Sequence, residues 1–522
     1  MDRRTSRQTE RPRRARSHDV DVVGSGPNGL SAAISLARQG FSVRVHEFAE
    51  VPGGGCKTVP LAGLLHGERT GHLAEHAELL SDPCSAVHPL ALASPFFRSL
   101  GLERHGLEYL HAPYPLGHLV GPGRSAVLPR ELQQVGEEHL GSGRDARVWS
   151  AALNPLAVHA DEIAALMLSD GRAPGSARAA AGNPAAIPAL GVGGVARATA
   201  ALGHGGRMLY SELRRHPESS PAALMAGLAV HAIAPPARPV AFGAGLLLGA
   251  TLHGRGWPVP RGGSGALLDA LLAELDSWGG SVDCGARVDS LDRLEGRAVI
   301  LAVGAAEARR ILAHSSGVRV PRAEIPRGGG AARVDFVLSG PVPWRDRRLE
   351  EAGTLHLTGT ATDAGYAERE VVAGRLPARP AILASQPWAA DHGRIATDGR
   401  RVLWTYAHVP NGNRQSVADA IAAEIEAHAS GFGDVVLTRV ERGTAELESA
   451  NPSYPGGDIA AGAATIPGMA FRYARSMDPY SAGTRGVWLA SASTPPGPGV
   501  HGMAGAHAAR RVAAALRSGC GR

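Results

Sequence analysis

The chain has 522 residues, of which 44% are hydrophobic and 20% charged, and its formal net charge is +6. A chain this long and this apolar exceeds one compact core, so we expect two domains and exclude a wholly disordered protein. Much of the positive excess lies between Arg3 and Arg16 and the rest is close to neutral, so we expect no nucleic-acid partner.

Residues 1–17 form an arginine-rich segment. It lacks the apolar core of a secretory signal, and its acidic residues and Pro12 argue against a transit peptide. Its low hydrophobicity and high charge predict a disordered tail. The cysteines are far apart and form no metal-ligand cluster, so we expect no metal site and a reducing, cytoplasmic setting. They are Cys56, Cys84, Cys284 and Cys520.

The segment from Asp19 to Glu47 predicts a strand, a tight turn, a helix over 30–38 and a second strand over 41–45. The glycines of the turn permit a sharp bend, close approach of the backbone to a pyrophosphate, and tight packing of the helix on the strand. Phosphates would meet the helix N-terminus, and the Glu47 carboxylate would accept ribose hydroxyls. The predicted contacts are Gly24, Gly26, Pro27, Asn28, Gly29 and Glu47. The acidic residue disfavours NADP and leaves FAD or NAD.

The stretch Val51-Pro-Gly-Gly-Gly-Cys-Lys-Thr58 resembles the G-G-x-x-x-[ST] motif of the amine-oxidase and phytoene-desaturase flavoproteins. In that family the motif lines the FAD, so the resemblance favours FAD and implies contacts from Gly54, Gly55 and Lys57. The alternative is a merely flexible loop. Family members usually carry arginine where Lys57 stands, so a phosphate contact would be looser here.

Residues Val59 to Pro83 depart from that family, because they form a longer segment rich in histidine and glutamate. Such an insertion either shifts the wall of the flavin site or bulges outward. Between residues 150 and 250 the chain is alanine-rich and apolar, notably at 179–189 and 222–252, which predicts helices suited to an apolar substrate or to an ordinary core. The most apolar run, Val240 to Thr251, is about half the roughly 20 residues of a membrane span, so we expect no transmembrane segment. A pocket wall and a shallow membrane contact stay open.

The next segments predict a return to the first domain. A helix over 266–278 and a strand from 281 follow a glycine-rich turn, and 298–304 reads as a buried parallel strand. By resemblance, the backbone near Val288 faces the adenine. Alternating strands around 333–338 and 402–408, with a helix over 416–429, predict a mixed-sheet substrate domain. Its pocket would lie between that sheet and the helices of residues 150–250.

Residues 486–505 and the helix over 506–516 resemble the last flavin-contacting motif of the family, which implies contacts from Gly502 and Met503. Many members place an aspartate here for the ribityl chain, whereas this chain has Ser491 and Ser493. His501 in this turn and His88 are the candidate catalytic side chains, either as partners of the reduced flavin or in a proton relay. The alternative is that each only fixes a loop.

Further motifs extend the resemblance over nearly everything from Asp19 onward, among them Cys84-Ser-Ala-Val-His-Pro89, His408-Val-Pro-Asn-Gly412 and Asp478-Pro-Tyr480. The pattern resembles the phytoene-dehydrogenase-like NAD(P)/FAD-dependent oxidoreductases. It implies an α/β fold with a discontinuous Rossmann-type FAD-binding domain at 18–83, 254–312 and 484–522. It also implies a mixed-sheet and helical substrate domain at 84–253 and 313–483.

The resemblance implies an FAD-dependent oxidoreductase that acts on an apolar small molecule, in the manner of a dehydrogenase or desaturase, by hydride transfer to flavin N5. The alternative is a non-catalytic binding protein on the same fold, as the Rab GDP-dissociation inhibitors are. An animal member of the branch leaves a regulatory role in mitochondrial function, with a mitochondrial matrix location, as a further alternative. The C-x-x-x-x-C pair of disulfide reductases is absent, so we expect no dithiol chemistry. A homodimer and a peripheral membrane contact stay open.

Overall fold

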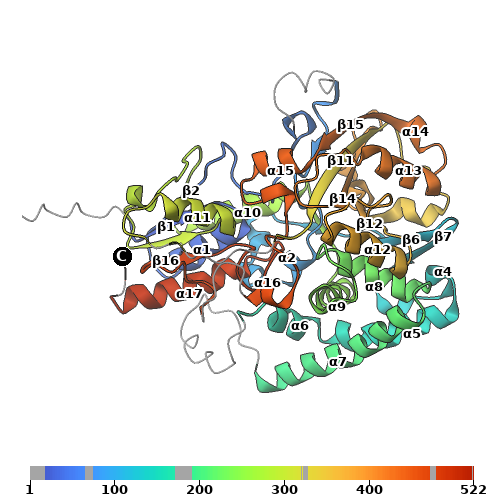
Figure 1. The fold of residues 1–522 in the computed structure, drawn as a ribbon, viewed down its shortest axis with the longest axis horizontal. Helices are drawn as coiled ribbons and strands as arrows, with labels where there is room; N and C mark the ends of the chain where they lie inside the picture. The colour runs from blue at the N-terminus through green and yellow to red at the C-terminus, as the bar shows by residue number, and fades with distance from the viewer. Residues whose placement is uncertain are drawn as a thin grey trace, which may run out of the picture.

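The computed structural model describes residues 18–64, 75–170, 191–318, 320, 327–470, 478–519 and 521. The predicted tail at 1–17, the alanine-rich stretch at 179–189 and Cys520 lie outside the described residues. Figure 1 shows two bodies side by side, one around a parallel sheet at the left and one around a larger sheet and a helical layer at the right.

Five parallel strands form the first sheet, in the order β16–β10–β1–β2–β9. They are β1 (Val20–Val23), β2 (Val43–His46), β9 (Ser281–Asp283), β10 (Ala298–Leu301) and β16 (Val487–Leu489). These strands come from three separate stretches of the chain, so the predicted α/β class with a Rossmann-type sheet is confirmed. The domain boundaries themselves stay a prediction.

Helices cover both faces of this sheet. The buried side chains of Val20 and Val22 pack among three helices, whereas Val23 faces a smaller cluster with a fourth helix on the other side. The three are α1 (Pro27–Ala37), α10 (Ser264–Ser277) and α17 (Met503–Arg517), and the fourth is α11 (Ala305–Ala313). Helix α1 begins three residues earlier than predicted, because Pro27 takes the first helical position, where a missing N–H costs nothing.

Two glycines let α1 approach its neighbours. A methyl group on Gly29 would lie 1.9 Å from the carbonyl oxygen of Gly24, and one on Gly505 would lie 1.9 Å from the carbonyl oxygen of Asn28. The obstructing atoms belong to backbone, which cannot turn aside. The close packing predicted for Gly29 therefore has a geometric basis.

We expect Gly505→Ala to lower the free energy of unfolding by about 1 to 3 kcal/mol, because α17 must move away from α1. Gly203→Ala is the matched control, since it also lies within a helix but meets only the flexible end of Arg207, at 3.4 Å. That control should stabilise by roughly 0.5 to 1 kcal/mol through helix propensity. Urea unfolding of both variants measures this, and equal stability of the two would contradict the packing argument.

Seven strands form the second sheet, in the order β15–β11–β14–β13–β12–β6–β7. They are β6 (Tyr114–Gly121), β7 (Arg124–Leu128), β11 (Gly330–Leu338), β12 (Ala352–Leu357), β13 (Ile382–Ser385), β14 (Arg401–Val409) and β15 (Val436–Arg442). Only β6 and β12 pair in parallel among these strands, so the predicted mixed sheet is confirmed. One face packs its hydrophobic side chains against α13 (Ala418–His428).

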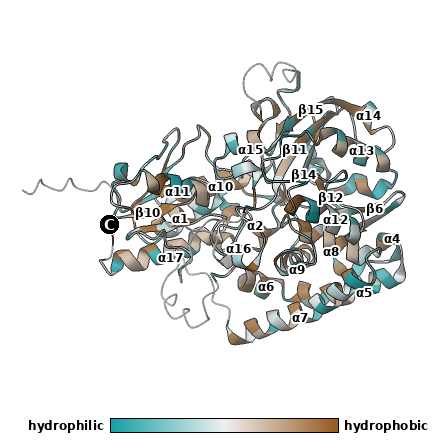
Figure 2. Cartoon of the chain, in the orientation of Figure 1, coloured by the Kyte–Doolittle hydropathy of each residue, from teal (hydrophilic) through white to brown (hydrophobic). Residues whose placement is uncertain are grey.

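The helical layer packs on the opposite face of that sheet at β6 and β7. It contains α5 (Gly143–Val158), α6 (Ala160–Met167), α7 (Val192–Arg215), α8 (Ser220–Val230) and α9 (Pro239–Gly254). Every residue of α8 is buried, and α8 and α9 are largely hydrophobic in Figure 2. Within the described residues we find no helix whose length and hydropathy would let it cross a membrane.

The remaining elements are short, apart from one helix of twelve residues. The helices are α2 (Pro89–Ala93), α3 (Pro95–Leu100), α4 (Glu137–Leu140), α12 (Ala361–Val372), α14 (Phe432–Val435), α15 (Thr444–Ala450) and α16 (Ile466–Ala470). Two antiparallel pairs join β3 (Val59–Pro60) to β4 (Leu80–Ser81) and β5 (Tyr109–Leu110) to β8 (Val259–Pro260).

The atypical segment after Thr58 packs on the outer part of the second sheet. Its described hydrophobic residues, Leu61, Leu64 and Leu79, cluster with side chains from β11, β14 and β15. Of the described residues of this segment, 59–64 and 75–83, only the last, Pro83, lines the cavity described below. For these residues the structure therefore favours an outward bulge over a shifted flavin wall.

Candidate functional site

A single cavity of about 670 Å³ runs from the carboxyl ends of β1 and β2 to the second sheet. Its first half is lined by most of the residues predicted to bind the dinucleotide. These are Gly24, Gly26, Pro27, Asn28, Glu47, Gly54, Gly55, Lys57 and Val288. The segments that the sequence connected only by resemblance therefore meet at one wall.

The first glycine turn leaves room where a phosphate would lie. Gly24 has a φ of 101°, and a side chain on it would meet the backbone of Ala302 at 2.9 Å. A methyl on Gly26, the N-cap of α1, would meet nothing within 4 Å, so the space beside the helix N-terminus is open. The buried Oδ1 of Asn28 has no hydrogen-bond partner within the described part of the chain. An open helix N-terminus with an unsatisfied amide is suited to a polar ligand.

Glu47 lies at the end of β2 and is 6% exposed. Its Oε2 accepts hydrogen bonds from Ser25 N at 2.9 Å and Ser25 Oγ at 2.6 Å, and its Oε1 accepts one from Ala49 N at 3.0 Å. A carboxylate has about four acceptor positions, so one remains for a ribose hydroxyl. The carboxylate is thus held in place by the glycine turn.

The second glycine loop packs directly against the first. A methyl on Gly54 would lie 3.3 Å from the Cα of Gly26. Lys57, the sole lysine of the chain, lines the cavity and forms no ion pair with any described residue. Burial lowers the pKa of its amine, although Glu47 opposes that shift. A half-buried cation without a partner is suited to an anionic ligand such as a pyrophosphate.

The C-terminal turn contributes to the wall through Ser491, Pro496, Gly499 and Val500. The predicted contacts Gly502 and Met503 do not line the cavity, nor does Gly29. Gly502 has a φ of 66°, and a methyl on it would lie 2.1 Å from Ser31 Oγ, so the turn at this point is pressed against α1. Their assignment as cofactor contacts stays a prediction.

His501 lies beneath this turn, outside the cavity wall. Its Nδ1 accepts a hydrogen bond from Met503 N at 3.0 Å, and its Nε2 lies 3.3 Å from the carbonyl oxygen of Gly497. Burial lowers the pKa of the imidazole to about 4, so the ring is neutral. Both nitrogens are used within the turn, which supports the loop-fixing alternative for this residue.

His88 does line the cavity, at the N-terminus of α2. Its Nε2 lies 2.7 Å from Ser264 Oγ, which in turn donates to the carbonyl oxygen of Ser85. His88 therefore carries its proton on Nε2, and its buried Nδ1 has no partner among the described residues. Burial lowers its pKa to about 4. A neutral ring with a bare Nδ1 accepts a hydrogen bond and cannot donate one to a reduced flavin.

Cys56 lies between the second glycine loop and α10. The thiol is 1% exposed and contacts the carbonyl oxygen of Ser264 at 3.5 Å. Burial raises the pKa of the thiol far above its usual range, so the thiolate needed for covalent attachment of a flavin is disfavoured.

The second half of the cavity lies where the sequence placed a substrate pocket, between the mixed sheet and the helices of residues 150–250, but its lining side chains were not identified from the sequence. Successive strands of the larger sheet direct alternate side chains into it, and the pairings place Leu383 opposite Tyr406 and Tyr406 opposite Arg333. The side chains on this half include Trp257, Thr354, Leu383, Trp404, Tyr406, Arg333, His231, Leu247 and Leu248. The alternation of Val402, Trp404, Tyr406 and His408 was the available signal in the sequence.

Arg333 is the charged group of this half, and it is already paired. It is 3% exposed, donates to Asp335 Oδ1 and Ser81 Oγ at 2.6 Å, and lies over the ring of Trp404 at 5.1 Å. The two acidic residues that line the cavity are Glu47, directly after β2, and Glu307 on α11, both at the dinucleotide half. The second half is therefore apolar and aromatic, without a free carboxylate.

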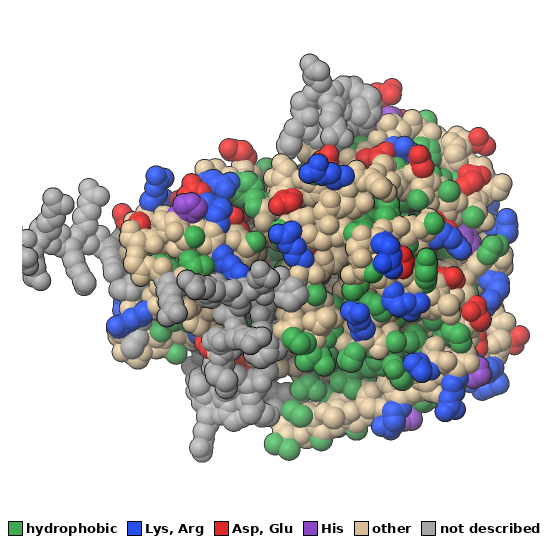
Figure 3. All heavy atoms as spheres, viewed as in Figure 1, with side chains coloured by type: hydrophobic (Ala, Val, Ile, Leu, Met, Phe, Trp, Pro, Cys, Tyr) green, Lys and Arg blue, Asp and Glu red, His purple; other side chains and the backbone are tan. Residues whose placement is uncertain are grey.

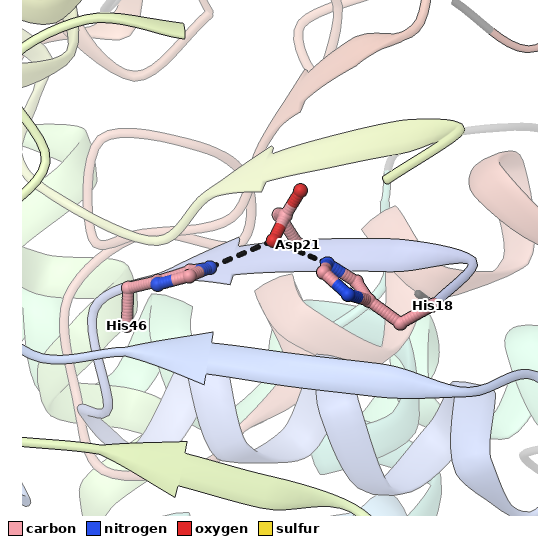
Figure 4. Close-up of side chains that lie close together, drawn as sticks. All are labelled: His18, Asp21 and His46. Atoms are coloured by element: carbon pink, nitrogen blue, oxygen red, sulfur yellow. Dashed lines mark hydrogen bonds and ion pairs between the residues drawn. The ribbon is translucent and has the colours of Figure 1, made fainter. Parts of the chain in front are cut away.

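A cluster of two histidines and one aspartate lies at β1 and β2 in the middle of the first sheet, and Figure 4 shows both rings turned toward Asp21. Oδ1 of Asp21 lies 2.6 Å from His18 Nε2 and 2.7 Å from His46 Nε2, and Oδ2 accepts from Gly296 N at 2.7 Å. Although burial acts in the opposite direction, these hydrogen bonds lower the pKa of Asp21. The three ligand atoms are close enough to hold a metal ion, but each already satisfies another, which supports a structural role.

The residues of the first half fit a dinucleotide. Two glycine loops, a helix N-terminus with an unsatisfied Asn28, a fixed carboxylate and an unpaired lysine surround one elongated space. Comparison with known proteins agrees: a model of the NAD(P)-binding Rossmann-like domain family matches residues 22–77.

Curated relatives fall into one long match and two short ones. Pyridine nucleotide-disulfide oxidoreductase domain-containing protein 2 of Rattus norvegicus is 24% identical over 95% of this chain and 93% of its own length. All-trans-zeta-carotene desaturase of Myxococcus xanthus is 62% identical over 42 residues, 8% of each chain. Thiamine thiazole synthase of Thermotoga maritima is 50% identical over 46 residues, 9% of this chain and 18% of its own. The two short matches span less than a fifth of those relatives.

Solved structures with the same fold cover nearly the whole chain. A putrescine oxidase variant superposes with a TM-score of 0.56 at 16% identity, covering 96% of this chain and 99% of its own. An oxidoreductase from Methanosarcina mazei gives 0.53 at 12% identity, covering 94% and 100%. Cyclohexylamine oxidase from Brevibacterium oxydans gives 0.50 at 15% identity, covering 96% and 99%. The predicted resemblance is confirmed at the level of fold, and with it the FAD type of dinucleotide site.

Proposed function

We propose that the chain is an FAD-dependent oxidoreductase that removes a hydride from an apolar small molecule. The observation that carries this proposal is the continuity of the cavity, which joins a dinucleotide-binding half to an apolar, aromatic half. Bound FAD would supply the two-electron chemistry, because the isoalloxazine accepts a hydride from a C–H bond. A cytoplasmic location stays a prediction.

In this proposal the protein binds, orients and excludes water. Glu47 and the α1 N-terminus hold the adenosine and pyrophosphate end, and Lys57 supplies the positive charge near the phosphates. Trp404, Tyr406 and Leu383 provide a rigid apolar wall that orients a substrate, since their positions are fixed by the sheet.

The lining of the second half favours a neutral substrate. A cationic amine would be desolvated there without a carboxylate to pair with, and it would lie near Arg333, which costs free energy. The carotene desaturase, which is similar over one short segment, is named for an apolar substrate that would suit this lining better than the putrescine of putrescine oxidase.

The surface also supports entry of an apolar molecule. In Figure 3 hydrophobic side chains gather on the visible face beside α7. Exposed large hydrophobic residues of α5, α7 and α16 include Val158, Val192 and Ile466. A peripheral contact with a membrane surface, from which such a substrate would be taken, is part of this proposal.

The experiment that tests the proposal is the visible spectrum of the purified protein before and after denaturation. We expect flavin bands and release of near-stoichiometric, non-covalent FAD, since Cys56 is a buried thiol. Acylation of Lys57, the only lysine of the chain, tests independently where FAD binds. Bound FAD should protect this amine from the reagent. A colourless protein that stays colourless with added FAD would instead support the non-catalytic binding protein.

A further inference from the structure

Three histidines, two of them buried, lead from the second half of the cavity into the protein. His231, at the end of α8, lines the cavity, and its Nε2 lies 3.0 Å from Nε2 of His356 on β12. His356 pairs across the sheet with His118 on β6, and their rings meet edge to face at 5.8 Å. His118 and His356 are fully buried, so His231 is the member that faces the cavity.

At the end of this row that lies farthest from the cavity, a backbone carbonyl fixes which nitrogen of His118 carries a proton. Nε2 of His118 lies 2.8 Å from the carbonyl oxygen of Gly359. A carbonyl oxygen only accepts hydrogen bonds, so Nε2 must carry the proton. Burial lowers the pKa of His118 to about 4 even though the Gly359 contact opposes it, so the ring is neutral and its Nδ1 is bare.

The position of the proton on His118 determines the position of the proton on His356, because the two rings are close together. A methyl on Gly227 of α8 would lie 2.4 Å from Nδ1 of His356 and 2.8 Å from Nδ1 of His118, so both atoms point at the same place on α8. Neither atom has another partner in the described part of the chain. Two bare lone pairs crowded against the same point of α8 in a buried site repel, so His356 should place its proton on Nδ1.

The tautomer of His356 in turn determines the tautomer of His231, which lines the cavity. With its proton on Nδ1, His356 accepts at Nε2, so Nε2 of His231 must donate across the 3.0 Å contact. Burial lowers the pKa of His231 to about 3, and it lowers that of His356 well below the usual value. His231 is therefore neutral, and its bare nitrogen is Nδ1. The ring is held edge-on to Trp257 at 5.9 Å, within the cavity wall.

We propose that His231 is the proton acceptor for an apolar substrate that presents an O–H or uncharged N–H next to the C–H bond to be oxidised. This inference rests on the proposed function. The substrate loses the hydride of its C–H bond to the flavin and the proton of its X–H bond to Nδ1 of His231. The X–H electron pair becomes the new C=X π bond, and His231 becomes a cation.

A weakly basic histidine is sufficient for this step. As the hydride leaves, positive charge develops on the substrate and its X–H proton becomes strongly acidic, so a weak base placed in hydrogen-bond contact accepts it. His356 and His118 are positioning residues, because they act only by fixing the tautomer of His231. Gly227 is needed to admit their two Nδ1 atoms beside α8.

Nitrogen NMR of protein with isotope-labelled histidine tests the tautomers. We expect the proton on Nε2 in His231 and His118 and on Nδ1 in His356, with signals assigned from His231→Gln, His356→Gln and His118→Gln. Gly227→Ala should disturb the His356 tautomer, whereas Gly203→Ala should not. An unchanged far-ultraviolet circular dichroism spectrum shows that each variant is folded. If Gly227→Ala does not fold, the tautomers of the wild-type protein alone decide. A proton on Nδ1 of His231 in the wild-type protein would overturn the proposal.

Phenol, an apolar ring with one O–H donor, tests the proton-accepting role without an identified substrate. We expect phenol to shift the Nδ1 resonance of His231, and benzene, the same ring without a donor, to leave it nearly unchanged. The shift should diminish at least severalfold in His356→Gln. Equal effects of the two ligands, or a shift of His88 instead, would overturn the proposal. Because these readouts do not require flavin, absence of FAD would refute the proposed function separately.

Discussion

Replacement of Glu47 by glutamine is expected to weaken FAD binding by about 10- to 100-fold. The carboxylate is held at the glycine turn by Ser25 and Ala49, and the ribose would take its remaining acceptor position. A hydrogen bond to a charged acceptor is worth roughly 1.5 to 3 kcal/mol, and the amide keeps the size of the side chain while losing that charge. Quenching of flavin fluorescence on titration of the FAD-free protein measures the dissociation constant.

Glu50→Gln is the matched control for this prediction. It removes the same charge three residues further along, from an exposed side chain that does not line the cavity. We expect it to change FAD affinity less than about twofold, because exposed charges at that distance are screened. Equal losses in both variants would indicate a general electrostatic effect and would contradict the assigned role of Glu47.

The dinucleotide half could be predicted because its determinants are close together in the chain. The turn Gly24–Gly29 and Glu47 belong to one strand–helix–strand unit. Each glycine of the turn is needed because a side chain there would clash with nearby backbone or fill the space for a ligand. Gly26 leaves space for a ligand and Gly29 leaves space for a helix, and both needs are visible in the spacing of the sequence.

In the C-terminal turn, local spacing in the sequence is not sufficient to identify what each glycine contacts. The contact of Gly502 with the cofactor stays a prediction, and the structure shows another constraint there, since an added methyl would meet Ser31 and lie 2.6 Å from the ring of Phe97. A glycine in the sequence indicates a backbone constraint without naming the neighbour that imposes it. Only the tertiary structure distinguishes a ligand from another helix.

The sequence predicted the place of the second half of the cavity, between the mixed sheet and the helices of residues 150–250. Its lining side chains depend on long-range pairing and could not be predicted. His118 and His356 are separated by 238 positions yet stand opposite each other on adjacent strands, and His231 reaches them from α8. Composition indicated only that this region is apolar, which suited a core and a substrate pocket equally. The polar groups within it became visible only through the sheet register.

Buried neutral histidines should also make the protein acid-sensitive. Burial lowers the pKa to about 4 in His88, His118, His253 and His501 and to about 3 in His231. It also lowers the pKa of His356 and His507. Because these folded pKa values lie below the unfolded value of 6.5, the unfolded chain binds more protons at intermediate pH. Their contribution to stability is complete above pH 6.5 and is lost as the pH falls toward 4.

We therefore expect the urea midpoint to be nearly constant above about pH 7 and to fall steeply between pH 6 and about pH 4.5. Each such histidine costs about 1.4 kcal/mol per pH unit in that range, so several together would exhaust a typical stability of roughly 5 to 15 kcal/mol. Carboxylates with lowered pKa values act in the same direction only below about pH 4. His253→Gln, remote from the cavity wall, should reduce the slope by about one proton. A slope of less than one proton in the wild-type protein would show that these rings are not held neutral by burial.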